Sequence, residues 1–312
     1  MLDSAVVRYA AIIAGTVLWD AGAVLQKNAV SAMPAGRLPV MSLLRSARWM
    51  AGLLFTALGW GLFVFGLDRV PVSAARTITG GSYVILALFS TIFLRSPLSL
   101  VEWGALAVVT CGIVFLGLQE TAAAAAAPPQ APLVVLGVGC VALVSACILL
   151  ILMLLGRRQG QTAPGPRLAS ARLFCSAALS GLLGSVGDLL TKVFLSLLGA
   201  PQGPSFPPVA LCAVGLITFY LAGFYMLSRA YQVGTVVGGV VISDFFGRAG
   251  AVTLGALALS ERIGGAGAAG VERALGFLLV LGGSVLLGRF SGVSRSPGAP
   301  AGAREPPATS SP

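Results

Sequence analysis

The chain of 312 residues contains no histidine, and only 10% of its residues are charged. Without histidine, His-ligated metal sites and Ser-His or Cys-His catalysis are excluded. A soluble domain carries about 25% charged residues, whereas this chain is 57% hydrophobic. The composition therefore predicts an integral, multi-pass membrane protein. Because no metal-ligand cluster or nucleophile–base motif appears either, we expect neither an enzyme nor a bound cofactor.

The cysteines are few and odd in number, and all five lie inside apolar runs. They are Cys111, Cys140, Cys147, Cys175 and Cys212. No CxxC pair occurs, so we interpret them as small packing residues rather than a disulfide or metal set. The net charge of +10 is carried mostly by arginines between the apolar runs. Such loop cations orient membrane helices, and we expect no nucleic-acid partner.

Nine apolar runs approach the ~20 residues that a helix needs to cross a bilayer. The predicted spans are 9–28, 49–67, 72–94, 100–118, 132–155, 169–192, 208–229, 234–258 and 272–289, with the sixth able to continue to Leu198. Prolines mark the connections: Pro34, Pro39, Pro128, Pro129, Pro132, Pro164, Pro166, Pro204, Pro207 and Pro208. Residues 291–312 are rich in Ser, Pro, Gly and Ala, which predicts a disordered tail.

Arginine is distributed unevenly between the two sides that nine spans define. One side collects Arg37, Arg45, Arg48, Arg95, Arg157, Arg158, Arg167, Arg229, Arg289, Arg295 and Arg304, and the other only Arg8, Arg69, Arg262 and Arg273. An excess of Lys and Arg marks the cytoplasmic side. We therefore expect the N-terminus outside and the C-terminus in the cytoplasm, in the plasma (inner) membrane.

Three segments of the first half recur in the same order in the second half. They are Leu25-Gln26-Lys27 with Leu190-Thr191-Lys192, Arg69-Val70-Pro71 with Gln232-Val233-Gly234, and Gly112–Gly117 with Gly283–Gly288. Residues 1–118 and 157–290 would form two four-helix repeats, joined by a linker and central span over 119–156. An odd helix between them inverts the second unit, as in many secondary transporters. Chance similarity between apolar helices is the alternative.

Other motifs carry a family resemblance over most of residues 8–290. They are the polar Gln26-Lys27, the run from Trp49-Met50-Ala51-Gly52 to Leu67 followed by Val70-Pro71-Val72, and Ala258-Leu259-Ser260-Glu261-Arg262 before a Gly-rich last helix. In these the sequence resembles the drug/metabolite transporter (DMT) superfamily, in its EamA-like, NIPA-type nine-helix branch. The resemblance implies an all-α polytopic fold and transmembrane transport. Phe93-Leu94-Arg95-Ser96 stands where that family usually has an acidic residue, and the proline often found in the middle of spans 3 and 8 is missing.

The polar residues within the apolar runs are the candidates for a substrate or ion pathway. They are Asp20, Gln26, Lys27, Arg76, Tyr83, Asp188, Lys192, Ser243, Asp244 and Arg248. A charge in hydrocarbon costs at least ~2.5–3.5 kcal/mol, so such groups face a protein interior or a watery cavity. Asp244 and Arg248 share a helical face, and either line a cavity or form a self-neutralised pair that locks span 8.

Each of the other candidates also has a structural interpretation. Asp20 binds a proton or cation, or is a partner for Lys27. Lys192 either acts with Asp188 or extends to the interface, and Arg76 either attracts an anion or pairs with Asp68. Three further carboxylates, Glu102, Glu261 and Glu272, are placed at helix ends as structural groups.

Three functions remain open at this stage. The first is a secondary transporter of a small solute, with Asp20 or Asp244 exchanging a proton; Arg248 favours an anionic or zwitterionic solute. The second is a NIPA-like transporter of Mg²⁺, a cation that prefers oxygen ligands. The third is a membrane scaffold without flux. A bound metal and a homodimer are left open, and the lipid bilayer is the one firm partner.

Overall fold

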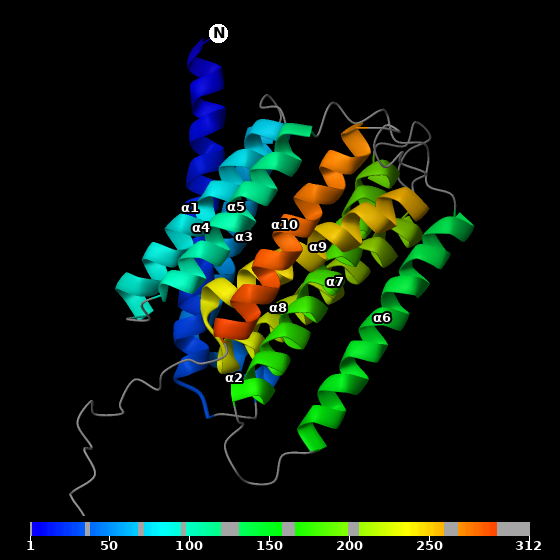
Figure 1. The fold of residues 1–312 in the computed structure, drawn as a ribbon. Coiled ribbons are helices and arrows are strands. Elements are labelled where there is room, and N and C mark those ends of the chain that lie inside the picture. Colours follow the sequence, from blue (N-terminus) through cyan, green and yellow to red (C-terminus); the bar gives the residue numbers. More distant parts are fainter. Residues whose placement is uncertain are drawn as a thin grey trace, which may run out of the picture.

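The computed structural model describes residues 2–34, 38–67, 72–94, 98–119, 131–157, 166–198, 206–258 and 268–291. This part of the chain is entirely helical and forms ten α-helices (Figure 1). The helices are α1 (Leu2–Ser31), α2 (Val40–Arg45), α3 (Ala47–Leu67), α4 (Val72–Leu94), α5 (Leu100–Gln119), α6 (Ala131–Arg157), α7 (Pro166–Leu198), α8 (Phe206–Val233), α9 (Val236–Ala258) and α10 (Ala268–Ser291).

Four stretches of the described helices are long and apolar enough, by length and composition, to cross a membrane. They are Val6–Ser31, Ala47–Gly66, Leu168–Thr191 and Phe206–Val233. Shorter apolar stretches lie in α4, α5, α6 and α10. Large apolar side chains are exposed on the outside of the helices; Leu211 of α8 is 75% exposed. These observations fit the all-helical integral membrane protein that the composition predicts.

Each predicted span coincides with one of the long helices. Most helices run further at one or both ends, the span 72–94 has the predicted bounds, and α9 begins two residues later than its predicted span. The span predicted at 169–192 continues to Leu198, and the first helix extends from Leu2 to Ser31. The short helix α2 occupies part of the predicted first loop. The number of membrane crossings and the inverted repeat stay predictions, and the predicted disordered tail lies outside the described residues except for Ser291.

Several prolines that were assigned to loops lie in the first turns of helices instead. Pro166 opens α7, Pro132 is the second residue of α6, and Pro207 and Pro208 follow Phe206 in α8. The prediction was wrong here because first-turn N–H groups have no acceptor within the helix, so proline loses nothing there.

A capping box begins α5. The Ser99 backbone N–H and hydroxyl donate to Glu102 Oε2 at 2.8 and 2.9 Å, and the Glu102 N–H donates to Ser99 Oγ at 3.3 Å. This arrangement satisfies donors that a helix start leaves unpaired, so Glu102 has the structural role expected for it. Glu272 is the fifth residue of α10 rather than its end, and Glu261 lies outside the described residues.

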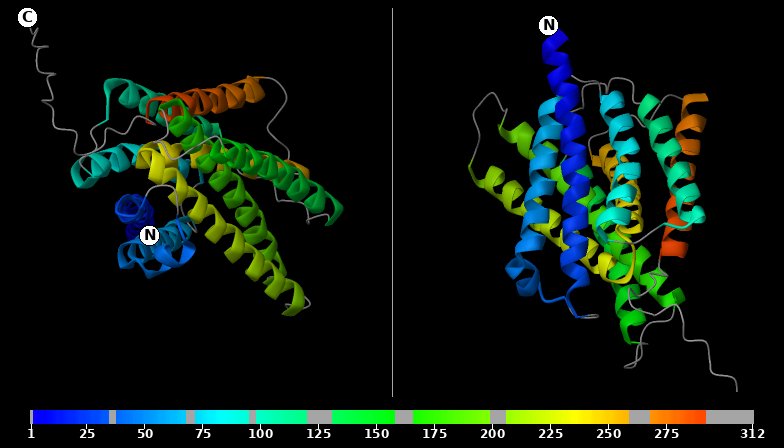
Figure 2. Two further views of the ribbon diagram at one scale, coloured as in Figure 1. Left: turned by 90° about the horizontal axis from the view of Figure 1, so that it is seen from below. Right: turned by 90° about the vertical axis from the view of Figure 1, so that its left-hand side faces the viewer.

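Glycines spaced by seven residues bring α1 and α3 into backbone contact. A Cβ on Gly15 would lie 2.6 Å from the Gly59 carbonyl oxygen, and one on Gly22 would lie 2.7 Å from that of Gly52. The two helices lie side by side along much of their length (Figure 2). Small residues permit such close packing between membrane helices, which holds the long α1 in place.

The remaining helices pack around one another in a bundle. Helix α4 packs against α1, α5 and α9; α7 packs against α8, α9 and α6; and α5 packs against α10. The largest apolar core joins buried residues of α1, α4, α5 and α9, among them Val24, Leu86, Val109 and Val237. Helix α6 lies at one edge of the bundle (Figure 1). The central contacts therefore bring α1 and α4 against α9.

Candidate functional site

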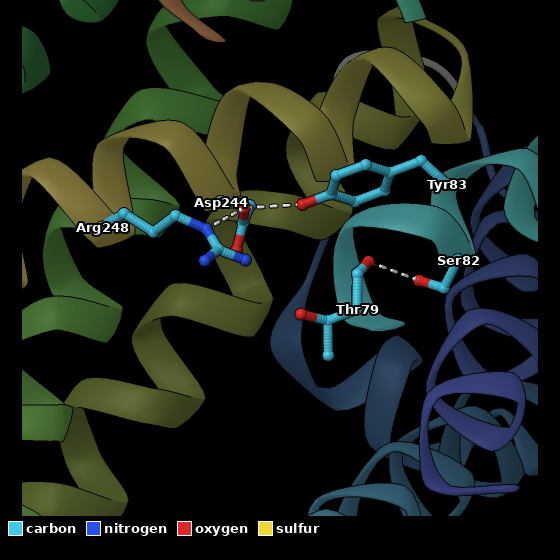
Figure 3. Close-up of polar contacts among 5 residues, drawn as sticks. All are labelled: Thr79, Ser82, Tyr83, Asp244 and Arg248. Carbon is cyan, nitrogen blue, oxygen red and sulfur yellow. Dashed lines mark hydrogen bonds and ion pairs between the residues drawn. The ribbon is translucent and has the colours of Figure 1, made fainter. Parts of the chain in front are cut away.

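Tyr83 of α4 reaches across to the charged pair of α9 (Figure 3). Its hydroxyl donates a hydrogen bond to Asp244 Oδ2 at 2.6 Å. Arg248 Nε donates to the same oxygen, also at 2.6 Å. One carboxylate oxygen thus accepts from a residue of its own helix and from a residue 161 positions away in the chain.

The local geometry follows from the helices. Residues four apart share one face of an α-helix, so Arg248 folds back onto Asp244. Tyr83 is buried, at 5% exposure, whereas the side chains of Asp244 and Arg248 are 29% and 16% exposed. The α9 pair is therefore neutralised and hydrogen-bonded, and it is only partly buried.

A second polar group, Asp20 of α1, lies close to Ser82, the residue before Tyr83 in α4. The Asp20 carboxyl is 5% exposed and interacts with the Ser82 hydroxyl. Ser82 also donates to the Thr79 carbonyl at 3.0 Å (Figure 3). Within the described part of the chain, Asp20 Oδ2 has no hydrogen-bond partner, and neither does the hydroxyl of Tyr231. Asp20 and the Tyr231 phenol are close enough to interact electrostatically, but no hydrogen bond joins them.

Hydrogen bonds connect the end of α8 to the α1–α3 region, and we call this set the α8-end contacts. The four bonds run from Lys27 Nζ to the Tyr231 carbonyl, from Gln232 Nε2 to the Pro34 carbonyl at 3.2 Å, from the Tyr225 hydroxyl to the Leu38 carbonyl at 3.1 Å and from Trp49 Nε1 to Ser228 Oγ at 3.0 Å. Trp49 and Ser228 are buried. These bonds close one end of the interface between the two halves of the chain.

The other predicted site residues lie apart from the α4–α9 contact or have structural partners. Gln26 is buried and reaches Thr56 Oγ1 of α3 at 3.5 Å. Ser243 bonds to Ser180 Oγ of α7 at 3.1 Å. Asp188 is exposed at the surface of α7 and accepts from the Tyr220 hydroxyl at 2.6 Å. The side chains of Arg76 in α4 and Lys192 in α7 lie outside the described structure.

Two contributors were not singled out from the sequence. Tyr231 is wholly buried, at 0% exposure, and interacts electrostatically with Asp20. The available signal was a tyrosine just before Gln232, at the end of an apolar run. Ser82 is adjacent to Tyr83, and its burial at 6% could have been suspected from its place within an apolar helix.

The described residues offer no preformed metal centre, because no group of three or more His, Cys, Asp and Glu side chains comes together among them. The chemistry that the α4–α9 contact offers is a guanidinium, a carboxylate and a phenol within hydrogen-bonding distance of one another. This set can bind a group that carries negative charge together with hydrogen-bond donors.

Comparison with known proteins gives one informative similarity. The chain is 25% identical over 285 residues to a protein of Arabidopsis thaliana described as "Probable magnesium transporter NIPA9", and the match covers 88% of this chain and 80% of that protein. No protein-family model matches the chain, and no solved structure matches it. The similarity spans both halves of the chain and includes α4 and α9.

Proposed function

We propose that the chain is a secondary membrane transporter that moves a small solute by alternating access. In this proposal nine spans form two inverted units, α1 with α3–α5 and α7–α10, joined by α6. The similarity to a probable magnesium transporter over most of the chain supports a transport function. The proposed location is the plasma (inner) membrane, with the N-terminus outside.

The packing of the helices supports the repeat. In the first unit α1 packs against α3 and α4, and α4 packs against α5. In the second unit α7 packs against α8 and α9, and α9 packs against α10. In the proposed repeat, α1, α3, α4 and α5 correspond to α7, α8, α9 and α10 in that order. Corresponding helices therefore have corresponding neighbours, as expected for two copies of one folding unit.

The contact between α5 and α10 adds an independent argument. A Cβ on Gly112 would lie 3.0 Å from the Gly276 carbonyl oxygen, and one on Gly283 would lie 2.9 Å from that of Ala105. The sequence match of Gly112 with Gly283 also matches Ala105 with Gly276. When each residue is replaced by its match in the other unit, the Gly112–Gly276 contact becomes the Gly283–Ala105 contact. Two units related by a two-fold axis have this property.

The observation that carries the proposal is the hydrogen bond from Tyr83 to Asp244, because it joins the two units beside an ion pair that is only partly buried. Transporters of inverted-repeat architecture bind their substrate near the midplane at the repeat interface. An anionic or zwitterionic solute would bind to Arg248 and compete for the hydrogen bonds of Asp244 and Tyr83. The α8-end contacts would close the cytoplasmic side in this state.

Transport of Mg²⁺ is the second candidate, and the similarity to a probable magnesium transporter favours it. Mg²⁺ prefers oxygen ligands and keeps several of its waters. Asp244 and Tyr83 supply oxygens at the unit interface, but a cation there would meet the guanidinium of Arg248 at 2.6 Å from the carboxylate. Magnesium flux would therefore require Arg248 to move away from Asp244.

Purified protein in proteoliposomes distinguishes these functions. A thermal-shift panel of zwitterionic amino acids, organic anions and MgCl₂ selects ligands, and flux of each stabilising ligand is then measured. We expect a flux that Tyr83→Phe lowers roughly tenfold or more, because a hydrogen bond to a charged group contributes about 1.5–3 kcal/mol.

Tyr220→Phe is the matched control, since Tyr220 also donates to an aspartate at 2.6 Å but within the second unit. Equal losses in the two variants would contradict a site at the α4–α9 contact. Folded protein that moves none of the three ligand classes would instead favour a scaffold without flux.

A further inference from the structure

We infer that Asp20 is the site that binds and releases the coupling proton, separate from the solute site at Asp244 and Arg248. The coupling role rests on the proposed transport function, whereas the proton site itself stands on the geometry around Asp20. That geometry is a buried carboxyl with an unpartnered oxygen, at the place where α1 meets α4 and the end of α8.

Among the described residues, the carboxyl of Asp20 has few polar partners. Its Oδ2 has no hydrogen-bond partner among the described residues, and the carboxyl is 95% shielded, since its exposure is 5%. The Tyr231 hydroxyl, which interacts with Asp20 electrostatically but not through a hydrogen bond, is also buried and unpartnered. A proton on the carboxyl removes the charge and turns an acceptor into a donor.

The charged and titratable groups around Asp20 agree with this assignment. Lys27, two turns along α1, donates to the Tyr231 carbonyl. Helix α9 contributes the Asp244–Arg248 pair, whose charges neutralise each other and whose carboxylate accepts a hydrogen bond from Tyr83 of α4. Helix α3 has one charged residue, Arg48, whose guanidinium reaches the Asn28 side chain. Asp244 already accepts hydrogen bonds from a guanidinium and a phenol. Asp20 is therefore the better candidate to bind the proton.

A proton also fits this site better than a metal cation does. Metal cations bound through oxygen require several oxygen ligands. Besides the Asp20 carboxyl itself, the described side chains that interact with it offer only the hydroxyls of Ser82 and Tyr231. A proton needs one acceptor. It would arrive from one aqueous face, bind to the Asp20 carboxylate and leave to the other face. The carboxylate then returns to its starting state, and one proton with its charge has crossed the membrane.

Helix α4 provides the physical connection between the two sites. Ser82 interacts with Asp20 and its neighbour Tyr83 bonds to Asp244. Consecutive residues of a helix point about 100° apart, so one turn of α4 presents Ser82 to α1 and Tyr83 to α9. A change of protonation at Asp20 therefore acts on the same turn that holds the solute site.

Infrared difference spectroscopy tests the proton site without transport. The carbonyl stretch of a protonated carboxyl is recorded for purified protein in lipid as the buffer is changed from mildly alkaline to mildly acidic. We expect the wild type to show a band from a buried carboxyl, shifted by D₂O, that is absent from Asp20→Asn. The matched control Asp188→Asn removes an exposed aspartate and should keep the band.

Tyr231→Phe provides a second variant should Asp20→Asn fail to fold. It removes a buried hydroxyl that has no hydrogen-bond partner in the described structure, so the fold should tolerate it. The band should shift in frequency, because the phenol interacts electrostatically with Asp20. A wild type without the band, or a band unchanged by both variants, would overturn the assignment. A band that behaves as expected in a protein that moves no amino acid, organic anion or Mg²⁺ would instead support the proton site and overturn the transport function.

Discussion

Substituting Gly52 by alanine should separate α1 from α3 and destabilise the protein. A Cβ at this position would lie 2.7 Å from the Gly22 carbonyl oxygen, 2.7 Å from Gln26 Cγ and 3.1 Å from the Gln26 backbone nitrogen. Ordinary contact begins at 3.4 Å, so the backbone atoms must retreat by about 0.7 Å. Overpacking of this kind costs about 1–3 kcal/mol, and two of the three atoms belong to a backbone that cannot rotate away.

Gly61→Ala, on the same helix, is the matched control because a Cβ there meets nothing within 4 Å. Alanine gains about 0.8–1 kcal/mol over glycine in a helix, and this gain is common to both variants. The free energy of unfolding, measured by SDS titration in mixed micelles, should therefore be about 1–3 kcal/mol lower for Gly52→Ala than for Gly61→Ala. Equal stability of the two variants would refute the glycine contact between α1 and α3.

Two further substitutions test individual contacts by the same unfolding measurement. Trp49→Phe removes the buried hydrogen bond to Ser228 and should lower the free energy of unfolding by about 0.5–1.5 kcal/mol. The control Trp60→Phe, at a residue 45% exposed, should change it little. A larger loss in the control would contradict the α8-end contacts. Ser99→Ala breaks the capping box of α5 and should cost about 0.5–2 kcal/mol, whereas Ser170→Ala, whose hydroxyl bonds at 3.3 Å to the Arg289 carbonyl, makes no cap and should cost less.

The helices could be predicted from the sequence because long apolar runs leave the backbone no other way to satisfy its polar groups in lipid. Their ends could not, since proline signals both a break and a helix start, as Pro207 and Pro208 show in α8. The six-residue α2 was missed because it is too short to have a hydrophobic period of its own. Helix bounds here depend on capping and on neighbouring chain segments.

In the candidate site, contacts within one helix could be predicted from the sequence, whereas contacts between helices could not. Asp244 and Arg248 could be paired from their spacing, because i and i+4 meet on any helix. Tyr83 could be suspected but not assigned to Asp244, since 161 residues separate them and only the packing of α4 on α9 brings them together. The alternative that Lys27 compensates Asp20 could not be judged from sequence, because the ammonium finds the Tyr231 carbonyl of a distant helix.

The two interpretations of the α9 pair, a structural lock and a solute site, are compatible in this geometry. Arg248 alone would neutralise Asp244 within the helix, so the hydroxyl of Tyr83 is not needed to compensate the charge. What Tyr83 adds is a short bond between the two halves of the chain, which can persist only while α4 and α9 stay together. In the proposed transporter, a solute that drew Arg248 away would leave Asp244 with an uncompensated charge and so a stronger bond to Tyr83. The interface would therefore open only if the solute also competed for the Tyr83 hydroxyl, which the proposal requires.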